Sequence, residues 1–244
     1  MLLHKTEGIV LRIVRYGETS VIAHVLTELF GVQSYMVNGV RGSRTSGARA
    51  SLLQPANILD MVVYHRDGDH LQRISDIRFS YLYRSLYADM VKNAVALYLV
   101  ELLDKALRQP EPHAELFYLA REALQWMDGA GAGIGNLPLY FTLRLSEMLG
   151  FRFYRHACAA TPYLDLREGS FVGEVPPHGQ YLDEACGLVT DALLRVPGFA
   201  GLGDVKTDKH TRQRLLAAYQ EYYRLHLPGF TGLRSPGILA EVLD

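Results

Sequence analysis

Arginine is the residue type whose placement most clearly predicts chemistry in this chain of 244 residues. Arg41, Arg44 and Arg49 lie in the segment NGVRGSRTSGAR, and no acidic residue occurs between Glu28 and Asp60. Guanidinium groups bind phosphate by charge and by paired hydrogen bonds, and glycine and serine let a phosphate approach the backbone. The segment is therefore a candidate phosphate-binding loop. The alternative is an exposed loop whose charge only keeps the protein soluble.

A second group of basic residues belongs to the last predicted helix, residues 207–226, and to the segment before it. Lys206, Lys209 and Arg224 are its candidate phosphate contacts. At 100° per residue, Lys209 and Arg224 fall on one side of the helix, opposite large apolar and aromatic residues. One side should therefore pack and the other should be basic, although a charged outer side is most often only solvated surface. Tyr35 is the candidate exposed aromatic residue that would stack on bases.

Motifs of enzymes and of metal sites are absent from the sequence. There is no H-E-x-x-H, G-x-S-x-G, Walker or protein-kinase motif. The glycine-rich segment 129–135 lacks phosphate-loop spacing and joins two predicted helices, which indicates a linker. Asp67 and Asp69 flank a glycine in a predicted turn, where this pattern is common. We therefore predict no catalytic residue, no cofactor and no metal ligand, and we expect that the protein is not an enzyme.

The elements that must position these residues change character near residue 80. Before it, five short segments rich in β-branched and aromatic residues are separated by turns, and they span 8–16, 20–27, 32–37, 56–65 and 69–77. Five short strands predict a small closed barrel, either an oligonucleotide-binding (OB) fold or an SH3-like barrel. The arginine segment lies between the third and fourth strands.

After residue 80 the apolar residues recur at helical spacing. We expect helices over 86–103, 115–127, 136–150, 183–195 and 207–226, with Asn136 as an N-cap. Scattered aromatic residues, glycines and prolines at about 151–180 indicate an irregular insertion. The predicted fold class is thus α+β with two domains: a nucleic-acid-binding barrel over 1–80, and a helical domain over 81–244 that carries the insertion.

Composition agrees with two folded domains and indicates little about partners. Hydrophobic residues make up 49% and charged residues 21%, and 25 basic against 26 acidic residues leave a net charge of −1. Residues 1–80 hold nine basic and seven acidic residues, so the barrel is +2 and the remainder −3. Two cysteines and an N-terminus without a signal-peptide core favour a cytoplasmic location, and we expect no membrane span.

Several segments, in their order and spacing, resemble the RecO family of bacterial recombination mediators. The segments are TEGIVLR at 6–12, YGETS at 16–20, VLT at 25–27, VNGVR at 37–41, LQP at 53–55, YYRLHLPGF at 222–230 and LRS at 233–235. Together they span nearly the whole chain. The resemblance implies an N-terminal OB-fold barrel joined to a helical domain, without enzymatic turnover.

The resemblance also implies a function in DNA repair and homologous recombination. Members of the family bind single- and double-stranded DNA, anneal complementary strands and bind the acidic C-terminal tail of single-strand-binding protein. With RecR they help to load RecA onto DNA coated by that protein, in the RecF pathway, which implies a cytoplasmic, nucleoid-associated protein. The family's basic loop matches Arg41 and Arg44 here, whereas Arg49 is added from charge pattern alone.

One departure from the family concerns metal binding. Many members carry a four-cysteine zinc site in the insertion, made of two C-x-x-C pairs. Here only Cys158 of the first pair remains, and Gly173 and Pro176 stand where the second pair is expected. A single thiolate cannot make a closed tetrahedral site, so we expect a zinc-finger-like insertion that lacks its ligands and binds no zinc.

Two other functions remain open from the sequence. An adaptor would hold an acidic, aromatic-ended peptide in an apolar groove rimmed by Arg121, Arg144 and Arg152, with DNA binding secondary. A metal-dependent nuclease is less favoured, because the acidic residues lack the spacing of a metal site. In the favoured hypothesis the cationic loop screens two DNA strands, and weak, salt-sensitive contacts let them slide into register.

Overall fold

The computed structural model describes residues 2–40, 46–66, 71–107, 109, 111–154 and 156–243. It divides into two compact units. The barrel unit comprises Met1–Arg84 and Val100–Gln125, and the helical unit comprises Ser85–Leu99 and Trp126–Asp244. A domain boundary at residue 80 stays a prediction.

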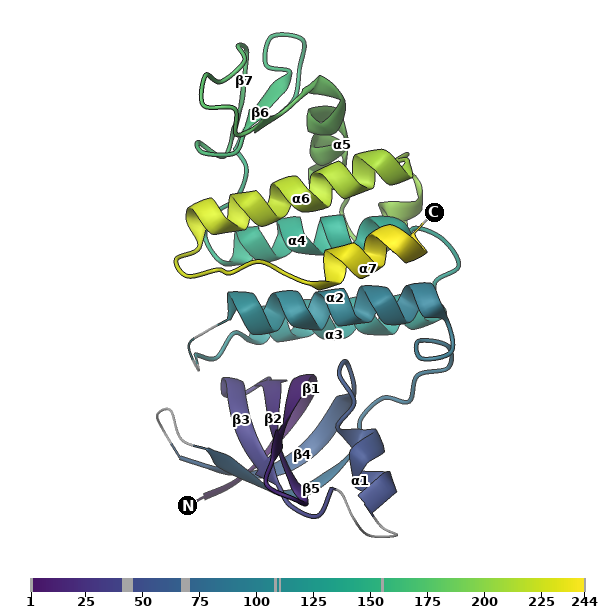
Figure 1. The fold of residues 1–244 in the computed structure, drawn as a ribbon. Helices are drawn as coiled ribbons and strands as arrows, with labels where there is room; N and C mark the ends of the chain where they lie inside the picture. Colours follow the sequence, from purple (N-terminus) through teal and green to yellow (C-terminus); the bar gives the residue numbers. More distant parts are fainter. Residues whose placement is uncertain are drawn as a thin grey trace. The chain divides into compact units, whose positions relative to one another are not determined.

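The barrel unit is built on five strands: β1 (Leu2–Tyr16), β2 (Ser20–Thr27), β3 (Gly31–Val37), β4 (Ile58–His65) and β5 (Gln72–Phe79). They close in the order β1-β2-β3-β5-β4 (Figure 1). β4 pairs with β1 along eight residues, and a short parallel pairing joins β3 to β5. A five-stranded closed barrel of this kind is the OB-type arrangement. The predicted α+β class with an N-terminal OB-like barrel is therefore confirmed.

The core of the barrel is formed by the inward side of each strand. Buried and half-buried residues alternate along β2 and β3, as expected for strands with one face inside a barrel. The inward side chains are mostly aliphatic: Val10, Val21, Ala23, Val25, Tyr35, Val37, Leu59, Met61 and Val63, with Val40 and Leu53 from the connections. A short helix, α1 (Ser46–Leu52), precedes β4 and was not predicted from the sequence.

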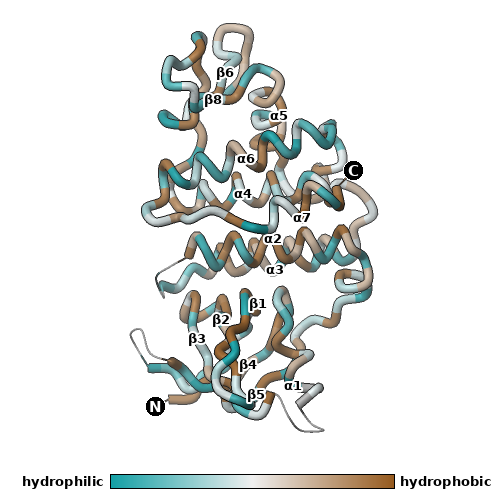
Figure 2. Tube along the Cα trace, viewed as in Figure 1, coloured by the Kyte–Doolittle hydropathy of each residue, from teal (hydrophilic) through white to brown (hydrophobic). Residues whose placement is uncertain are grey.

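The helices that follow β5 in the described part of the chain are α2 (Met90–Ala106), α3 (Ala114–Gly129), α4 (Leu137–Met148), α5 (Glu184–Arg195), α6 (Lys209–His226) and α7 (Ser235–Val242), with 3-10 turns η1 (Ile134–Asn136) and η2 (Phe199–Gly203). Within the helical unit α4, α5 and α6 pack on one another, and α7 lies against α6. Figure 2 shows hydrophilic and hydrophobic segments alternating along the helices, as expected for helices with one buried side. The five predicted helices are confirmed to within a few residues, whereas α7 was missed.

Asn136 occupies the N-cap position of α4, as predicted, but its side chain does not cap the helix by a hydrogen bond. Its amide instead donates to the carbonyl oxygens of Leu202, at 2.9 Å, and Val205, at 2.8 Å. This buried side chain therefore fixes the segment after η2, because it satisfies two backbone carbonyls there.

The insertion contains a small sheet in the order β7-β6-β8, formed by β6 (Tyr163–Asp165), β7 (Ser170–Val172) and β8 (Tyr181–Leu182). Leu164, Phe171 and Leu182 are buried, so the sheet has an apolar side. The insertion is thus more regular than the sequence suggested. In the described part of the chain, the helices are too short or too polar to cross a membrane.

Candidate nucleic-acid interface

The barrel mouth is the end of the barrel formed by the β1–β2 turn, the end of β3 and α1. Gly17 supplies a left-handed conformation in the turn, with φ of 62°. The backbone amide of Val40 donates to the carbonyl of Thr19 at 2.9 Å, and the Ser20 hydroxyl donates to the side chain of Asn38 at 3.0 Å. The turn and the end of β3 are therefore tied together.

Three exposed arginines lie at or beside the mouth. Arg15 pairs with Val21, which pairs in turn with Val37, so Arg15 stands in the last rows of the barrel. The Arg49 guanidinium donates to the carbonyl of Asn38 at 3.2 Å, one residue beyond Val37. Arg73 pairs with Met36 across the β3–β5 junction.

Neighbouring strands are about 4.8 Å apart, so long arginine side chains on these rows can reach one phosphate chain. Within the described residues, none of Arg15, Arg49 and Arg73 has a carboxylate partner. Their charge is consequently available to a polyanion.

The aromatic residue at the mouth is Tyr16, which is 52% exposed at the end of β1. The prediction that Tyr35 is exposed is wrong, because Tyr35 is fully buried in the barrel core and burial raises the pKa of its hydroxyl. In β3 the side of Gln33, Tyr35 and Val37 faces inward. Sequence alternation shows that these residues share a face, but it does not show which face is inside.

The predicted arginine loop is only partly described. Arg41 and Arg44 lie outside the described residues. Arg49 was expected in a loop, but it lies in α1, so its side chain is held by a helical turn as well as by Asn38. Arg15 and Arg73 are not predicted from the sequence, because only the register of β1 and β5 brings them to the same end of the barrel.

A groove on another part of the barrel carries the opposite charge. It has a volume of about 490 Å³, and its charged lining consists of Glu7, Glu28, Asp60 and Asp76 with Lys5 and Arg78. Arg78 is bound to Asp60 at 2.9 Å, which leaves the carboxylates in excess. Glu7 and Arg15 are eight residues apart on β1, about 25 Å at the rise of a strand. The barrel therefore separates an acidic groove from a basic mouth.

The basic residues of the last helix do not form one surface. Lys206 precedes α6 and Lys209 is its first residue, whereas Arg224 lies in its last turn, about 22 Å from Lys209 at the rise of an α-helix. Arg224 pairs with Glu221 at 3.3 Å. The Gln213 side chain donates to Ala240 in α7, so the side of α6 expected to be exposed is partly covered by the C-terminal segment. The unpredicted helix α7 is the reason for this difference.

The three arginines predicted to rim a peptide groove lie in different places. Arg121 belongs to the barrel unit and pairs with Glu7 at 3.2 Å. Arg144 and Arg152 lie in the helical unit on either side of Glu147, at 2.6 Å and 4.0 Å. Only the last two share a site, a cavity of about 310 Å³.

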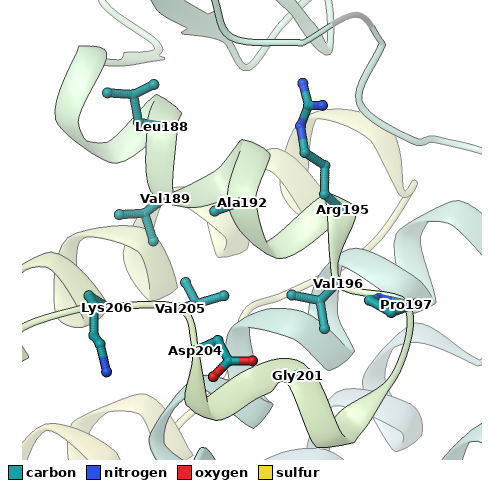
Figure 3. Close-up of a pocket in the computed structure, with 10 residues that line it drawn as sticks. All are labelled: Leu188, Val189, Ala192, Arg195, Val196, Pro197, Gly201, Asp204, Val205 and Lys206. Carbon is teal, nitrogen blue, oxygen red and sulfur yellow. The ribbon is translucent and has the colours of Figure 1, made fainter.

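A different cavity of the helical unit has the apolar character expected of a peptide groove. It has a volume of about 470 Å³ and is lined by α5, η2 and the segments that follow each of them (Figure 3). Its wall is aliphatic, with Val189, Ala192, Val196 and Val205. Arg195, Asp204 and Lys206 supply the charged groups of its lining.

The insertion does not have the donor set of a zinc site. The Cys158 thiol lies 3.0 Å from the Thr161 hydroxyl, which stands where a second thiolate would be needed. A Cβ atom on Gly173 would lie 2.6 Å from the carbonyl oxygen of Ala160, so the segments that carry Cys158 and Gly173 are in close backbone contact. Cys186 is buried in α5, where burial raises the pKa of its thiol to about 11. In the described part of the chain, no three His, Cys, Asp or Glu side chains gather as a metal site. These residues do not fit a tetrahedral zinc ion.

Comparison with known proteins identifies both parts of the chain. The family model "Recombination protein O N terminal" matches residues 1–83, and "Recombination protein O C terminal" matches residues 87–235. The DNA repair protein RecO of Phocaeicola vulgatus is 31% identical over the full length of both chains, and that of Bacteroides fragilis is 32% identical, also over the full length. The RecO protein of Christiangramia forsetii is 30% identical over 99% of each chain. The chain therefore belongs to the RecO family of DNA repair proteins, which are recombination mediators and not enzymes.

Proposed function

We propose that this protein binds single- and double-stranded DNA at the barrel mouth and anneals complementary strands. The observation that supports the proposal is the set of exposed arginines at the mouth that have no carboxylate partner among the described residues, Arg15, Arg49 and Arg73. Free guanidinium groups release counterions when they bind phosphates, which is the main source of sequence-independent affinity for DNA. Arg41 and Arg44, which the sequence predicts to bind phosphate, are proposed as further contacts to DNA.

Annealing by this surface requires no catalytic residue. Cations that neutralise phosphates on two strands lower the repulsion between the strands, and contacts that carry no sequence information let them shift until they pair. Tyr16, beside Arg15, is the exposed aromatic side chain that would stack on a base of a single strand. Lys206, Lys209 and Arg224 remain secondary candidates, because they are dispersed along α6.

In the cell, we propose, the protein helps to load RecA onto DNA coated by single-strand-binding protein, with RecR as its direct partner. It would act in the cytoplasm at the nucleoid. Family membership supports this role, and the barrel mouth supplies the DNA contact that the role requires.

The test is the salt dependence of DNA binding by the full-length protein. The double variant Arg15→Gln/Arg49→Gln should bind duplex DNA more weakly, and the slope of log K against log salt should fall by about 1.8 for two lost phosphate contacts. The matched control, Lys5→Gln/Arg78→Gln, removes the same charge from the acidic groove of the same barrel. An unchanged slope for the mouth variant, or an equal change for the control, would contradict the proposal.

We also propose that the apolar cavity of Figure 3 holds the acidic C-terminal tail of single-strand-binding protein. Its aliphatic wall suits an apolar terminal side chain, and Arg195 and Lys206 suit the carboxylates that accompany it. The variants Val189→Asp and Arg195→Gln should bind a peptide of the tail sequence more weakly than the wild-type protein. Arg144→Gln should bind the peptide normally. This comparison distinguishes the cavity of Figure 3 from the peptide site that the sequence predicts at Arg144.

A further inference from the structure

The cavity beside Arg144 and Arg152 has the chemistry of a nucleotide site. It lies wholly within the helical unit and has a volume of about 310 Å³, at the lower end of the usual range for ligand pockets. Its lining comprises two arginines, a glutamate, two aromatic residues, a histidine and a leucine: Arg144, Arg152, Glu147, Phe153, Tyr154, His156 and Leu194. We propose that it binds one nucleotide of a single DNA strand, as a contact separate from the barrel mouth.

Charge at this cavity favours an anion. Arg144 lies 2.6 Å and Arg152 lies 4.0 Å from opposite oxygens of the one carboxylate of Glu147. Two guanidinium groups thus share a single negative charge, and each has five N–H donors, most of which the carboxylate cannot occupy. A phosphate beside them would take the remaining donors and balance the remaining charge.

An aromatic platform stands next to these cations. Tyr154 is 53% exposed, and the Arg152 guanidinium carbon lies 5.4 Å from the centre of its ring. Arginine planes and tyrosine rings are both surfaces on which unpaired bases stack, without regard to base identity. A base in a duplex is already stacked and paired, so this feature selects a single strand.

The platform is held in place by its surroundings. The backbone amide of Tyr154 donates to Gly169 at 2.7 Å, and the Phe171 amide donates to the Tyr154 carbonyl at 3.4 Å. Beside it, Phe153 is buried and stacks on Tyr222 with ring centres 4.1 Å apart. The backbone and Phe153 therefore fix the position, and the Tyr154 side chain can be changed without removing a core contact.

His156 supplies a polar group for the edge of a base. Its Nδ1 lies 2.7 Å from Oδ1 of Asp191. A carboxylate accepts hydrogen bonds, so Nδ1 carries the proton of the neutral ring and Nε2 is left to accept a hydrogen bond from a base.

The test compares two single-stranded probes, a labelled oligothymidylate and an abasic strand of the same length, on the full-length protein. Tyr154→Ala should weaken binding of the oligothymidylate at least about fivefold, the lower limit for loss of one stacked base. Tyr154→Phe should bind normally, because the ring is kept. Neither change should alter binding of the abasic strand.

The phosphate part of the proposal has its own variant. Arg152→Gln should weaken binding of both probes and lower the single-strand salt slope by about 0.7, the effect of one phosphate contact. Arg167→Gln is the matched control, since Arg167 is an exposed arginine of the same insertion whose side chain bonds Gln180 outside the cavity.

The proposal is overturned if Tyr154→Ala binds the oligothymidylate as tightly as the wild-type protein does. It is overturned too if the substitution weakens binding of the abasic strand as much as binding of the oligothymidylate. It is also overturned if Arg167→Gln weakens binding of the probes as much as Arg152→Gln does. The same holds if the Tyr154 and Arg152 variants bind both probes normally and lose only the binding of an acidic peptide. The inference rests on the proposed DNA binding, but the two fail differently. If the mouth variants do not change the salt slope, the proposal that DNA binds at the barrel mouth is refuted. If the Tyr154 and Arg152 variants bind both probes like the wild-type protein, only the proposal that this cavity binds a nucleotide is refuted.

Discussion

The barrel unit and the helical unit differ in the hydrogen bonding of their buried tyrosine hydroxyls. The barrel core is aliphatic apart from Tyr35, whose buried hydroxyl has no hydrogen-bond partner in the described structure. In the helical unit the buried hydroxyls of Tyr219 and Tyr223 bond to Thr190 and to the carbonyl of Thr142, both at 2.8 Å. A buried tyrosine hydroxyl is therefore hydrogen-bonded in the core of the helical unit and, among the described residues, unbonded in the barrel core, although buried polar side chains at the rim of the barrel, such as Asn57 and Gln72, form hydrogen bonds.

The exposed arginines of the barrel mouth also differ from those of the helical unit. Elsewhere in the barrel unit arginines are paired, as Arg78 is with Asp60. The arginines at the barrel mouth have no carboxylate partners in the described structure, whereas three arginines of the helical unit, Arg195, Arg214 and Arg224, each pair with a carboxylate. An exposed arginine that is not paired with a carboxylate is available to bind phosphate. This contrast teaches that counting basic residues in a sequence overestimates the surface open to DNA, because paired cations are already partly neutralised.

The strongest test of the contrast is the buried network at the start of the helical unit. The Asp128 carboxylate accepts hydrogen bonds from the backbone amides of Ser85, at 2.8 Å, and Leu86, at 2.9 Å. The buried Lys92 ammonium donates to the Asp128 carbonyl at 2.8 Å. Asp128→Ala should lower the free energy of unfolding by about 2–4 kcal/mol, because it leaves the backbone amides of Ser85 and Leu86 without their acceptor. The bond from Lys92 goes to the Asp128 backbone carbonyl and is kept.

Urea unfolding of the full-length protein measures this effect. Arg73→Gln, which removes an exposed charge from the barrel, should change the free energy of unfolding by less than about 0.5 kcal/mol. Similar losses for the two variants would show that the units do not differ in the way described.

The sequence predicted the elements well and their surfaces less well. β2 was predicted at its exact bounds, because β-branched residues between two glycine turns have no good helical alternative. Tyr35 was misplaced because a closed barrel fixes which side of β3 is inside only through pairing with distant strands. Arg15 was overlooked for the same reason, since only the β1–β2 register brings it to the mouth. α7 was missed because Pro236 and Gly237 within it are poor helix formers, and its packing on α6 compensates.

Acid should weaken the insertion of the helical unit through Asp165. Burial opposes ionisation of this carboxyl, but hydrogen bonds from the amides of Glu168 and Arg167 and from His178 outweigh it and lower its pKa. A lowered native pKa means that ionised Asp165 stabilises the fold above the usual carboxyl pKa of about 4, and that this stability is lost as pH falls through the native pKa.

Asp165→Asn should therefore reduce the free energy of unfolding by about 1.5–3 kcal/mol at pH 5, and the difference from the wild-type protein should shrink below about pH 4. Urea unfolding at a series of pH values checks this. A difference that stays constant down to pH 2.5 would mean that the charge of Asp165 does not contribute.

Removal of single hydroxyl groups gives the most direct comparison of the two cores. The Thr190 hydroxyl donates to the carbonyl of Cys186, so Tyr219 is the donor to Thr190. Tyr219→Phe should lower the free energy of unfolding by about 1–2 kcal/mol, because it removes a buried hydrogen bond. Tyr35→Phe should be neutral or stabilising, because it removes a buried hydroxyl that has no partner in the described structure.

The same pair of variants tests DNA binding by the barrel. Tyr35→Phe and Tyr219→Phe should both bind DNA like the wild-type protein, since neither residue is exposed. If Tyr35→Phe destabilised the protein as much as Tyr219→Phe, the hydroxyl of Tyr35 would have a partner and the contrast between the cores would be lost.

The smallest change in the free energy of unfolding is expected at Thr161 in the insertion, where hydrogen bonds occupy the position of a zinc ligand in related proteins. The Thr161 amide donates to the Cys158 carbonyl at 2.9 Å, and the Thr161 hydroxyl donates to the carbonyl of His156 at 3.2 Å. Thr161→Val should cost about 0.5–1.5 kcal/mol, whereas a chelator should not change the unfolding of the wild-type protein. A metal that bound this insertion would raise the unfolding midpoint with metal concentration, because binding to the folded state alone adds stability by mass action. A chelator-sensitive midpoint that Cys158→Ser abolishes would therefore show that the thiol, and not the Thr161 hydrogen bonds, holds the insertion together.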